Sequence, residues 1–360
     1  MQIGIIGYPY SGKTTLFETI AAIHEDSQHQ KKDENRAVIK VPDERLDILT
    51  KLFQPKRQVN ATIEIVDFAG LQYSEKKGEI FTPQFIAKIK TVDALLHVVR
   101  GFDDSNVPFY TDEINMERDI QNIEDELIFA DLIFVENRIN KLQNELKKQR
   151  NHEEMEKELL TMQIWKENLE NSIPLRELVF DENAMKYIVN YQPLSYKPLL
   201  IALNLSEDMV ETQEQIINEI RSKFSSQQIA ILPFFAKIEM ELSQLDEEEK
   251  QMFMQEYGLS VSPLNRLIQS AYNLLGLQSF FTVGEDETRS WTIKKGMNAQ
   301  QAAGVIHTDF YNKFIRAEVV HCDHLIQEGT IAKCREKGYL RLEGKDYIVK
   351  DGDILNIRHS

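Results

Sequence analysis

The sequence predicts an α/β fold: a mainly parallel sheet, interrupted by two long helices and followed by a small β-rich region. Three observations lead to this prediction. Short aliphatic strands alternate with helical stretches in the N-terminal third. Apolar residues recur at heptad-like spacing between about residues 118 and 170. After residue 281, short strand-like runs are separated by turns that contain glycine and aspartate.

Length and composition set the class of protein. A chain of 360 residues is long enough for two or three domains, and 42% hydrophobic residues provide a core. The apolar runs are too short to span a bilayer, and the N-terminus does not resemble a leader. We therefore expect a cytoplasmic monomer that makes no membrane contact.

The net charge is unevenly distributed. The formal charge of −16 argues against non-specific nucleic-acid binding by the whole surface. Residues 281–360 contain equal numbers of basic and acidic side chains, so the remainder of the chain carries the entire excess. Any contact with RNA is therefore expected in the C-terminal region.

The N-terminal third alternates strands and helices in the order that builds a parallel, doubly wound sheet. A strand is predicted at Gln2–Ile6 and a helix from about Lys13 to Ile23. Further buried strands are predicted at residues 62–66 and 94–99. The stretch from Glu25 to Arg36 is polar and contains almost no aliphatic residues, so we expect a mobile loop there.

The middle of the chain predicts an antiparallel helical coiled-coil hairpin. Its apolar positions are spaced three or four residues apart, with a polar break at residues 149–151. These positions are Ile128, Leu132, Val135, Ile139, Leu142 and Leu146, then Met155, Leu159, Met162, Trp165 and Leu169. Such a stripe is typical of a helix core rather than of a ligand groove.

The hairpin interrupts the α/β region, because strand signals return at Leu199–Asn204 and at residues 228–233. We therefore assign residues 1–117 and 197–279 to the α/β domain and residues 118–196 to an inserted helical domain. Residues 280–360 form the third, β-rich domain.

The strongest motif is the P-loop pattern G-x-x-x-x-G-K-[ST] at residues 7–14, which lies between a predicted strand and a predicted helix. Gly7 and Gly12 allow the backbone N–H groups to wrap a β-phosphate. Lys13 would neutralise β- and γ-phosphate oxygens, and the Thr14 hydroxyl would ligate Mg²⁺. The motif therefore predicts a nucleoside-triphosphate site.

A second element, Asp-Phe-Ala-Gly at residues 67–70, follows the strand at residues 62–66. Asp67 at a strand end beside a P-loop is placed to hold Mg²⁺ through water, and Gly70 could donate its backbone N–H to the γ-phosphate. This arrangement favours a GTPase-type switch. An aspartate in an ordinary turn is the simpler alternative.

A third element, Asn-Leu-Ser-Glu at residues 204–207, follows another apolar strand. GTPases carry Asn-Lys-x-Asp here, and the aspartate accepts two hydrogen bonds from guanine. Glu207 has a longer arm that would miss this geometry, so adenine becomes plausible. Alternatively, Ser206 simply caps the next helix.

Taken together, these segments resemble the YchF / Obg-like ATPase family. The segments that carry the resemblance are residues 42–46, 67–71, 92–94, 97–100, 102–104, 204–207, 236–239, 302–310, 314–319 and 341–347. The resemblance implies a P-loop NTPase G domain with a parallel-type sheet, an inserted coiled-coil hairpin and a C-terminal TGS domain of the β-grasp type.

The resemblance also implies an activity and its partners. Members bind and slowly hydrolyse ATP in preference to GTP, require Mg²⁺ and associate with ribosomes; the TGS and helical domains would face the ribosome or its RNA. By position, the phosphate-binding residues would be Tyr10, Ser11, Gly12, Lys13, Thr14 and Thr15. Asn204 and Glu207 would lie at the base, and Leu205 would meet it through its backbone.

Two departures from the family pattern concern catalysis. The chain has no threonine between Thr19 and Thr50, where switch I normally supplies a Mg²⁺ ligand, and Phe109 stands where the family tends to carry a histidine. Leu71, which is normal for the family, cannot orient water as the glutamine of classical GTPases does. Hydrolysis would then depend on Lys13, Mg²⁺ and backbone amides, so slow turnover is expected.

Other functions remain open. The missing side chains favour a nucleotide-binding interaction protein with negligible turnover, and a GTPase is disfavoured only by Glu207. A P-loop kinase of small molecules has weaker support. A zinc site around His321 and Cys322 lacks a second ligand pair at standard spacing, so Cys322 and Cys334 are expected to be free thiols.

Overall fold

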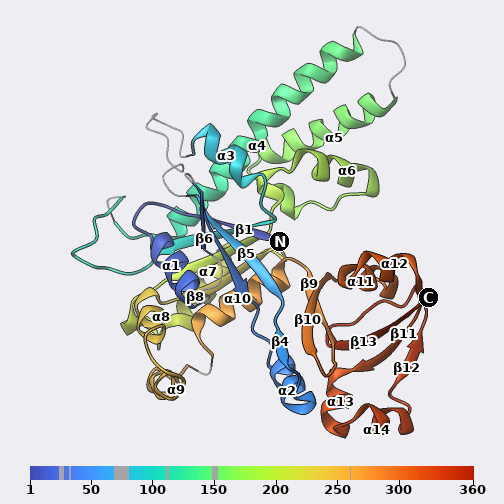
Figure 1. The fold of residues 1–360 in the computed structure, drawn as a ribbon. Coiled ribbons are helices and arrows are strands. Elements are labelled where there is room, and N and C mark those ends of the chain that lie inside the picture. Colours follow the sequence, from blue (N-terminus) through green and yellow to red (C-terminus); the bar gives the residue numbers. More distant parts are fainter. Residues whose placement is uncertain (24–27, 32–33, 69–80, 111–112, 148–152, 260) are drawn as a thin grey trace. The chain divides into compact units, whose positions relative to one another are not determined.

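The computed structural model describes the chain except residues 24–27, 32–33, 69–80, 111–112, 148–152 and 260 (Figure 1). The described residues form two compact units. The first contains Met1–Val38 and Glu64–Leu267, and the second contains Ile39–Ile63 and Ile268–Ser360. Among the helices described, none has the length and apolar character needed to cross a membrane.

The first unit is built on a seven-stranded sheet. In spatial order its strands are β2 (Gln28–Lys31), β3 (Glu34–Lys40), β5 (Thr62–Asp67), β1 (Gln2–Ile6), β6 (Ala94–Arg100), β7 (Leu199–Asn204) and β8 (Ile229–Phe234). β1 pairs in parallel with β5 and β6, and the pairs β6–β7 and β7–β8 are also parallel. The predicted parallel α/β sheet is therefore confirmed.

The edge of this sheet corrects one prediction. A mobile loop is predicted from Glu25 to Arg36, but β2 and the start of β3 lie there, and these strands pair antiparallel, with Gln28 opposite Ala37. Residues 25–27 and 32–33 of this stretch lie outside the described residues. A ladder is held by backbone hydrogen bonds, and an edge strand tolerates polar side chains that a central strand does not. The polar sequence therefore concealed a hairpin.

Several shorter helices belong to the first unit, and one of them shows clear signals at its N-terminus. They are α1 (Lys13–Ile23), α3 (Pro83–Ile89), α7 (Gln213–Lys223), α8 (Ala236–Leu242), α9 (Glu247–Glu256) and α10 (Pro263–Leu274), the last of which runs into the second unit. At α3 the Thr82 side chain accepts a hydrogen bond from the Phe85 N–H and Pro83 opens the helix, as expected for an N-terminus. Leu95 and Val99 of β6 pack with Ile120 in the core of this unit.

Two long helices occupy the region where the heptad spacing predicted them. α4 spans Met116–Leu146 and α5 spans Glu153–Glu170, and they pack against each other and against α6 (Glu182–Tyr191). Val135 and Leu142 share a buried cluster with Met162 and Trp165. The apolar stripe is therefore core, as predicted.

The second unit contains a six-stranded sheet. In spatial order its strands are β12 (Arg341–Glu343), β11 (Phe314–His321), β13 (Asp353–His359), β9 (Leu277–Thr282), β10 (Glu287–Lys294) and β4 (Arg57–Val59). Its helices are α2 (Glu44–Phe53), α11 (Ala299–Ile306), α12 (Thr308–Asn312), α13 (Cys322–Glu328) and α14 (Ile331–Glu336).

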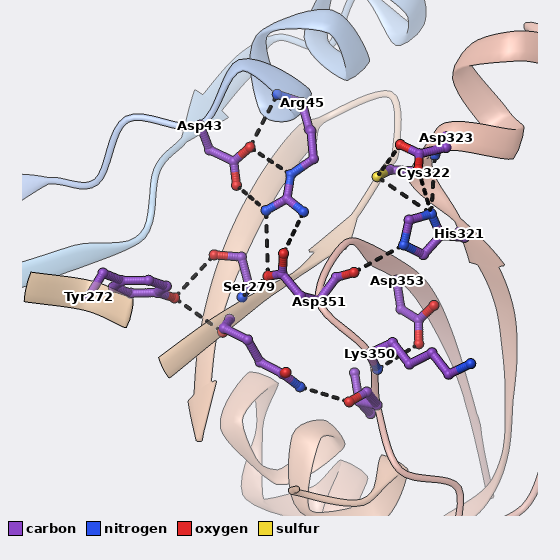
Figure 2. A network of polar contacts seen from close by, with 12 residues as sticks. Asp43, Arg45, Tyr272, Ser279, His321, Cys322, Asp323, Lys350, Asp351 and Asp353 are labelled. Carbon is purple, nitrogen blue, oxygen red and sulfur yellow. Dashed lines mark hydrogen bonds and ion pairs between the residues drawn. The ribbon is translucent and has the colours of Figure 1, made fainter. Parts of the chain in front are cut away.

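Residues 39–63 pack within this second unit, although the sequence analysis grouped them with the N-terminal domain. Leu49 of α2 is buried with Phe281 in one apolar cluster. The Arg45 guanidinium pairs with Asp43 at 2.8 Å and with Asp351 at 2.7 Å (Figure 2). Asp351 also accepts a hydrogen bond from the Ser279 N–H at 2.9 Å, so a polar network anchors the start of α2.

Candidate nucleotide-binding site

The loop between β1 and α1 has the backbone conformation of a phosphate-binding loop. Gly7 has φ +139° and Gly12 has φ +99°. A Cβ on Gly7 would lie 2.3 Å from the Val98 carbonyl oxygen, and one on Gly12 would lie 2.2 Å from Asn204 Nδ2. Both glycines are therefore required by close contacts as well as by backbone conformation.

Lys13 begins α1, and its ammonium folds back over this loop. Its Nζ donates to the Gly7 carbonyl at 2.8 Å and to the Tyr8 carbonyl at 2.6 Å. Burial lowers the pKa of Lys13 to about 8, although the nearby Asp67 carboxylate opposes this shift. The lysine is thus placed where a phosphate chain would lie, and it is partly desolvated before a ligand arrives.

The predicted Mg²⁺ ligands lie at the same edge of the sheet. Asp67 ends β5, next to β1, and is opposite Ile5 in the ladder. It is buried, and burial raises its pKa. Thr14 lies in the first turn of α1 and is exposed. A hydroxyl and a carboxylate are the hard oxygen donors that Mg²⁺ prefers, so these residues fit the ion.

Asn204, at the end of β7, links the phosphate loop to the start of α8 through its side chain. Its Nδ2 donates to the Ser11 carbonyl at 3.0 Å, and its Oδ1 accepts from the Ala236 N–H at 3.3 Å. The Leu205 N–H donates to the Phe234 carbonyl at 2.8 Å, which fixes the backbone after β7 to the end of β8.

A cavity of about 230 Å³ adjoins these residues. Its walls include five residues predicted from sequence: Gly12, Thr15, Asn204, Leu205 and Glu207. The sequence analysis did not assign the others to the site, although several lie in segments that carry the family resemblance. They are Phe102, Asp103, Asp104, Val107, Ser206, Ala236, Lys237 and Met240.

Beneath the phosphate loop lies a small polar group that the sequence analysis passed over. Ser11 and His97 are both buried and line a cavity of about 20 Å³. Within the described chain, the Ser11 hydroxyl and both ring nitrogens of His97 lack a hydrogen-bond partner. Burial lowers the pKa of His97 to about 3, so the imidazole is neutral at physiological pH.

The remaining predicted residues are placed as follows. Gly70 and Leu71 lie outside the described residues. Tyr10, with φ +63°, is 53% exposed. Phe109 is 48% exposed, and its ring centroid lies 4.7 Å from the guanidinium carbon of Arg100. Phe109 therefore contacts a cation and offers no group that could accept a proton from water.

Both cysteines are free and buried. Burial raises the pKa of Cys322 to about 12, so its thiolate is strongly disfavoured. The donor atoms of His321, Cys322 and Asp323 lie within 4.8 Å of one another. However, His321 Nε2 is already hydrogen-bonded to the Asp351 carbonyl at 3.0 Å (Figure 2).

Comparisons with known proteins match the chain to one family. Residues 2–138 match the family model described as 50S ribosome-binding GTPase, and residues 277–360 match a YchF GTPase C-terminal model described as a protein of unknown function. The chain is 39% identical to "Ribosome-binding ATPase YchF" of Bacillus subtilis, over 99% of both proteins. It is 37% identical to the protein of the same name in Escherichia coli O157:H7, over 99% of this chain and 98% of that one.

A solved structure leads to the same family. The YchF GTPase of Schizosaccharomyces pombe superposes with a TM-score of 0.88 at 31% identity, covering 99% of this chain and 97% of that chain. Full-length matches of this kind extend through both compact units and the helical hairpin. The chain belongs to the YchF family.

Proposed function

We propose that this protein is a slow, Mg²⁺-dependent ATPase whose nucleotide state controls its association with the ribosome. The observation that carries the proposal is the convergence of Lys13, the two loop glycines and Asn204 beside a cavity large enough for a base. Relatives named ribosome-binding ATPase support the choice of reaction and partner.

The residues around the phosphate site define the proposed chemistry. The reaction is attack of water on the γ-phosphate of ATP, which yields ADP and phosphate. Lys13 would neutralise the β- and γ-phosphate oxygens, and the Gly70 N–H would meet the γ-phosphate. Thr14 and Asp67 would hold Mg²⁺, which supplies charge neutralisation when bound. Phe109 contributes no proton acceptor, so turnover should be slow.

Base selection is the part of this proposal that can be tested first. Glu207 lines the cavity where a guanine-specific site would carry an aspartate, and its longer arm changes the position of the carboxylate. We expect calorimetric titration in Mg²⁺ to show tighter binding of ATP than of GTP. The reverse order would identify a GTPase, and a failure to bind either nucleotide would contradict the proposal.

Turnover separates the ATPase from its main alternative. The alternative is a nucleotide-binding interaction protein with negligible hydrolysis. It is favoured because residue 109 is a phenylalanine, which contacts Arg100 and has no imidazole. A single-turnover measurement of phosphate release should show slow hydrolysis that is lost in Lys13→Ala. Release no faster than that of ATP alone in buffer would favour the alternative.

The ribosome part of the proposal assigns the contact to two regions. The proposed architecture is an ATP-binding domain (residues 1–117 and 197–279), a helical domain (118–196) and a TGS domain (280–360), although residues 39–63 of the first domain pack within the second compact unit. The last two would contact the ribosome or its RNA, with the protein acting as a monomer. Co-sedimentation with ribosomes should depend on whether ATP or ADP is present, and equal recovery with both nucleotides would contradict nucleotide control.

A further inference from the structure

Arg100, the last residue of β6, holds the loop that follows this strand, residues 102–108. Its side chain is buried, and its guanidinium donates three hydrogen bonds to backbone carbonyls. Nε donates to Phe102 at 3.2 Å, Nη1 to Pro108 at 2.7 Å and Nη2 to Val107 at 3.1 Å. These bonds join the beginning of the loop to its far end, so the guanidinium works as an internal clamp.

Two aromatic rings contact the same guanidinium. The centroids of Phe102 and Phe109 each lie 4.7 Å from its central carbon. Such contacts stabilise a desolvated cation, and the planar arginine head group makes them while its edge donates hydrogen bonds. A lysine ammonium is a compact point charge and cannot reproduce the three in-plane bonds. The side chain is therefore specifically required at this position.

The clamped loop forms one wall of the base cavity. Phe102, Asp103, Asp104 and Val107 line this cavity together with residues 205–207, which follow β7. The loop is fixed at its start as well, because the Gly101 N–H donates to the Asn204 carbonyl at 2.8 Å. Arg100 itself does not line this cavity, so its influence on a ligand would pass through the loop.

We propose that Arg100 is a positioning residue that sets the affinity for the nucleoside part of the nucleotide by holding residues 102–108 as a wall of the base cavity. This inference rests on the proposed nucleotide-binding function. The contacts of Gly7, Gly12 and Asn204 at the phosphate-binding loop do not involve the Arg100 guanidinium, although Arg100 and Phe109 line the cavity of about 20 Å³ together with Ser11. Loss of the clamp should therefore weaken recognition of the base and leave recognition of the phosphates intact.

The test compares ATP with inorganic tripolyphosphate, which carries the phosphate chain but no nucleoside. Both are titrated calorimetrically into the full chain in Mg²⁺. In Arg100→Lys we expect ATP affinity to fall roughly tenfold, as for the loss of one to two hydrogen bonds. Tripolyphosphate affinity should be unchanged. Arg138→Lys, which alters an ion pair between α4 and α5, is the matched control and should leave both affinities unchanged.

A second variant, Phe109→Leu, keeps the proposal testable if Arg100→Lys does not fold. Phe109 is half exposed and contacts the clamp from outside, so Phe109→Leu should fold and show the same pattern with a smaller loss. Equal losses for ATP and tripolyphosphate, or no loss in Arg100→Lys, would overturn the role of Arg100 while leaving nucleotide binding intact. A wild-type protein that binds neither ligand would overturn the proposed function and this inference together.

Discussion

At the scale of single residues, burial determines the chemistry available at the phosphate site. The Lys13 ammonium donates hydrogen bonds to the Gly7 and Tyr8 carbonyls of its own loop, and desolvation lowers its pKa to about 8. Polyphosphate oxygens would replace these carbonyls and favour the charged amine. Under the proposed function, nucleotide binding would therefore be linked to protonation of Lys13.

This linkage predicts the pH dependence of ATP binding. Below pH 8 the amine is already charged in the free protein, whereas above pH 8 a proton must be taken up on binding. Affinity should therefore fall as pH rises above 8, by at most about tenfold per pH unit. Calorimetry in buffers of different ionisation enthalpy measures the uptake. Lys13→Arg is the control, because it stays charged, and a wild-type affinity that is flat from pH 7 to 9.5 would contradict the prediction.

The residues of the site could be predicted from sequence to different extents. Gly7, Gly12 and Lys13 belong to one contiguous motif whose spacing encodes a backbone shape, so the sequence alone predicts them as candidates. Phe102 and Lys237 lie on separate strand connections, after β6 and β8, that become neighbours only when the sheet forms. No local pattern reports that proximity, and the same limit hid the clamp formed by Arg100.

At the scale of elements, prediction succeeded where sequence imposes a period or a signal. The strand Gln2–Ile6 and the helix Lys13–Ile23 have the predicted bounds because the P-loop motif fixes the junction between them. The edge hairpin of β2 and β3 was missed because its polar side chains carry no apolar alternation. Contacts between elements, such as the junction of α8 and α10, likewise lacked a sequence signal.

This junction gives a prediction about stability. Glu239 of α8 is buried, and its Oε1 accepts a hydrogen bond from the Leu264 N–H at 2.7 Å in the first turn of α10. Burial raises its pKa to about 7. Because the pKa of Glu239 is higher in the folded protein than in the unfolded chain, its contribution to the free energy of unfolding depends on pH. This contribution is complete below the pKa of the unfolded chain, near 4.5, and is lost as pH rises through the folded pKa of about 7.

Replacing the carboxyl group by an amide should remove this pH dependence. The stability of Glu239→Gln relative to wild type, measured as the free energy of unfolding, should therefore increase by about 2 kcal/mol between pH 5.5 and 8.5. Urea titrations at several pH values measure the difference. Glu241→Gln alters an exposed residue of the same helix and is the control. Parallel pH profiles for wild type and Glu239→Gln would contradict the assignment.

At the scale of the whole molecule, the chain leaves the first unit and returns to it before reaching Asp67. β3 ends at Lys40 and β5 begins at Thr62, and the residues between them pack within the second unit. Position along the chain suggested the opposite grouping, because the cluster around Leu49 also contains residues such as Phe281 and Val320, which are more than 200 residues away in sequence. The unit to which residues 39–63 belong is determined by long-range packing, which no local sequence pattern encodes.

This packing predicts that a change in α2 destabilises the second unit. Leu49 is fully buried, so Leu49→Ala should lower the unfolding free energy by about 2–5 kcal/mol. The chain has two tryptophans, Trp165 in the first unit and Trp291 in the second, so ¹⁹F NMR of fluorotryptophan-labelled protein follows both units in one urea titration. The midpoint at Trp291 should fall in Leu49→Ala and change little in Leu52→Ala, which alters a 38% exposed neighbour. An unchanged Trp291 midpoint in Leu49→Ala, or a shift confined to Trp165, would show that residues 39–63 do not support the second unit.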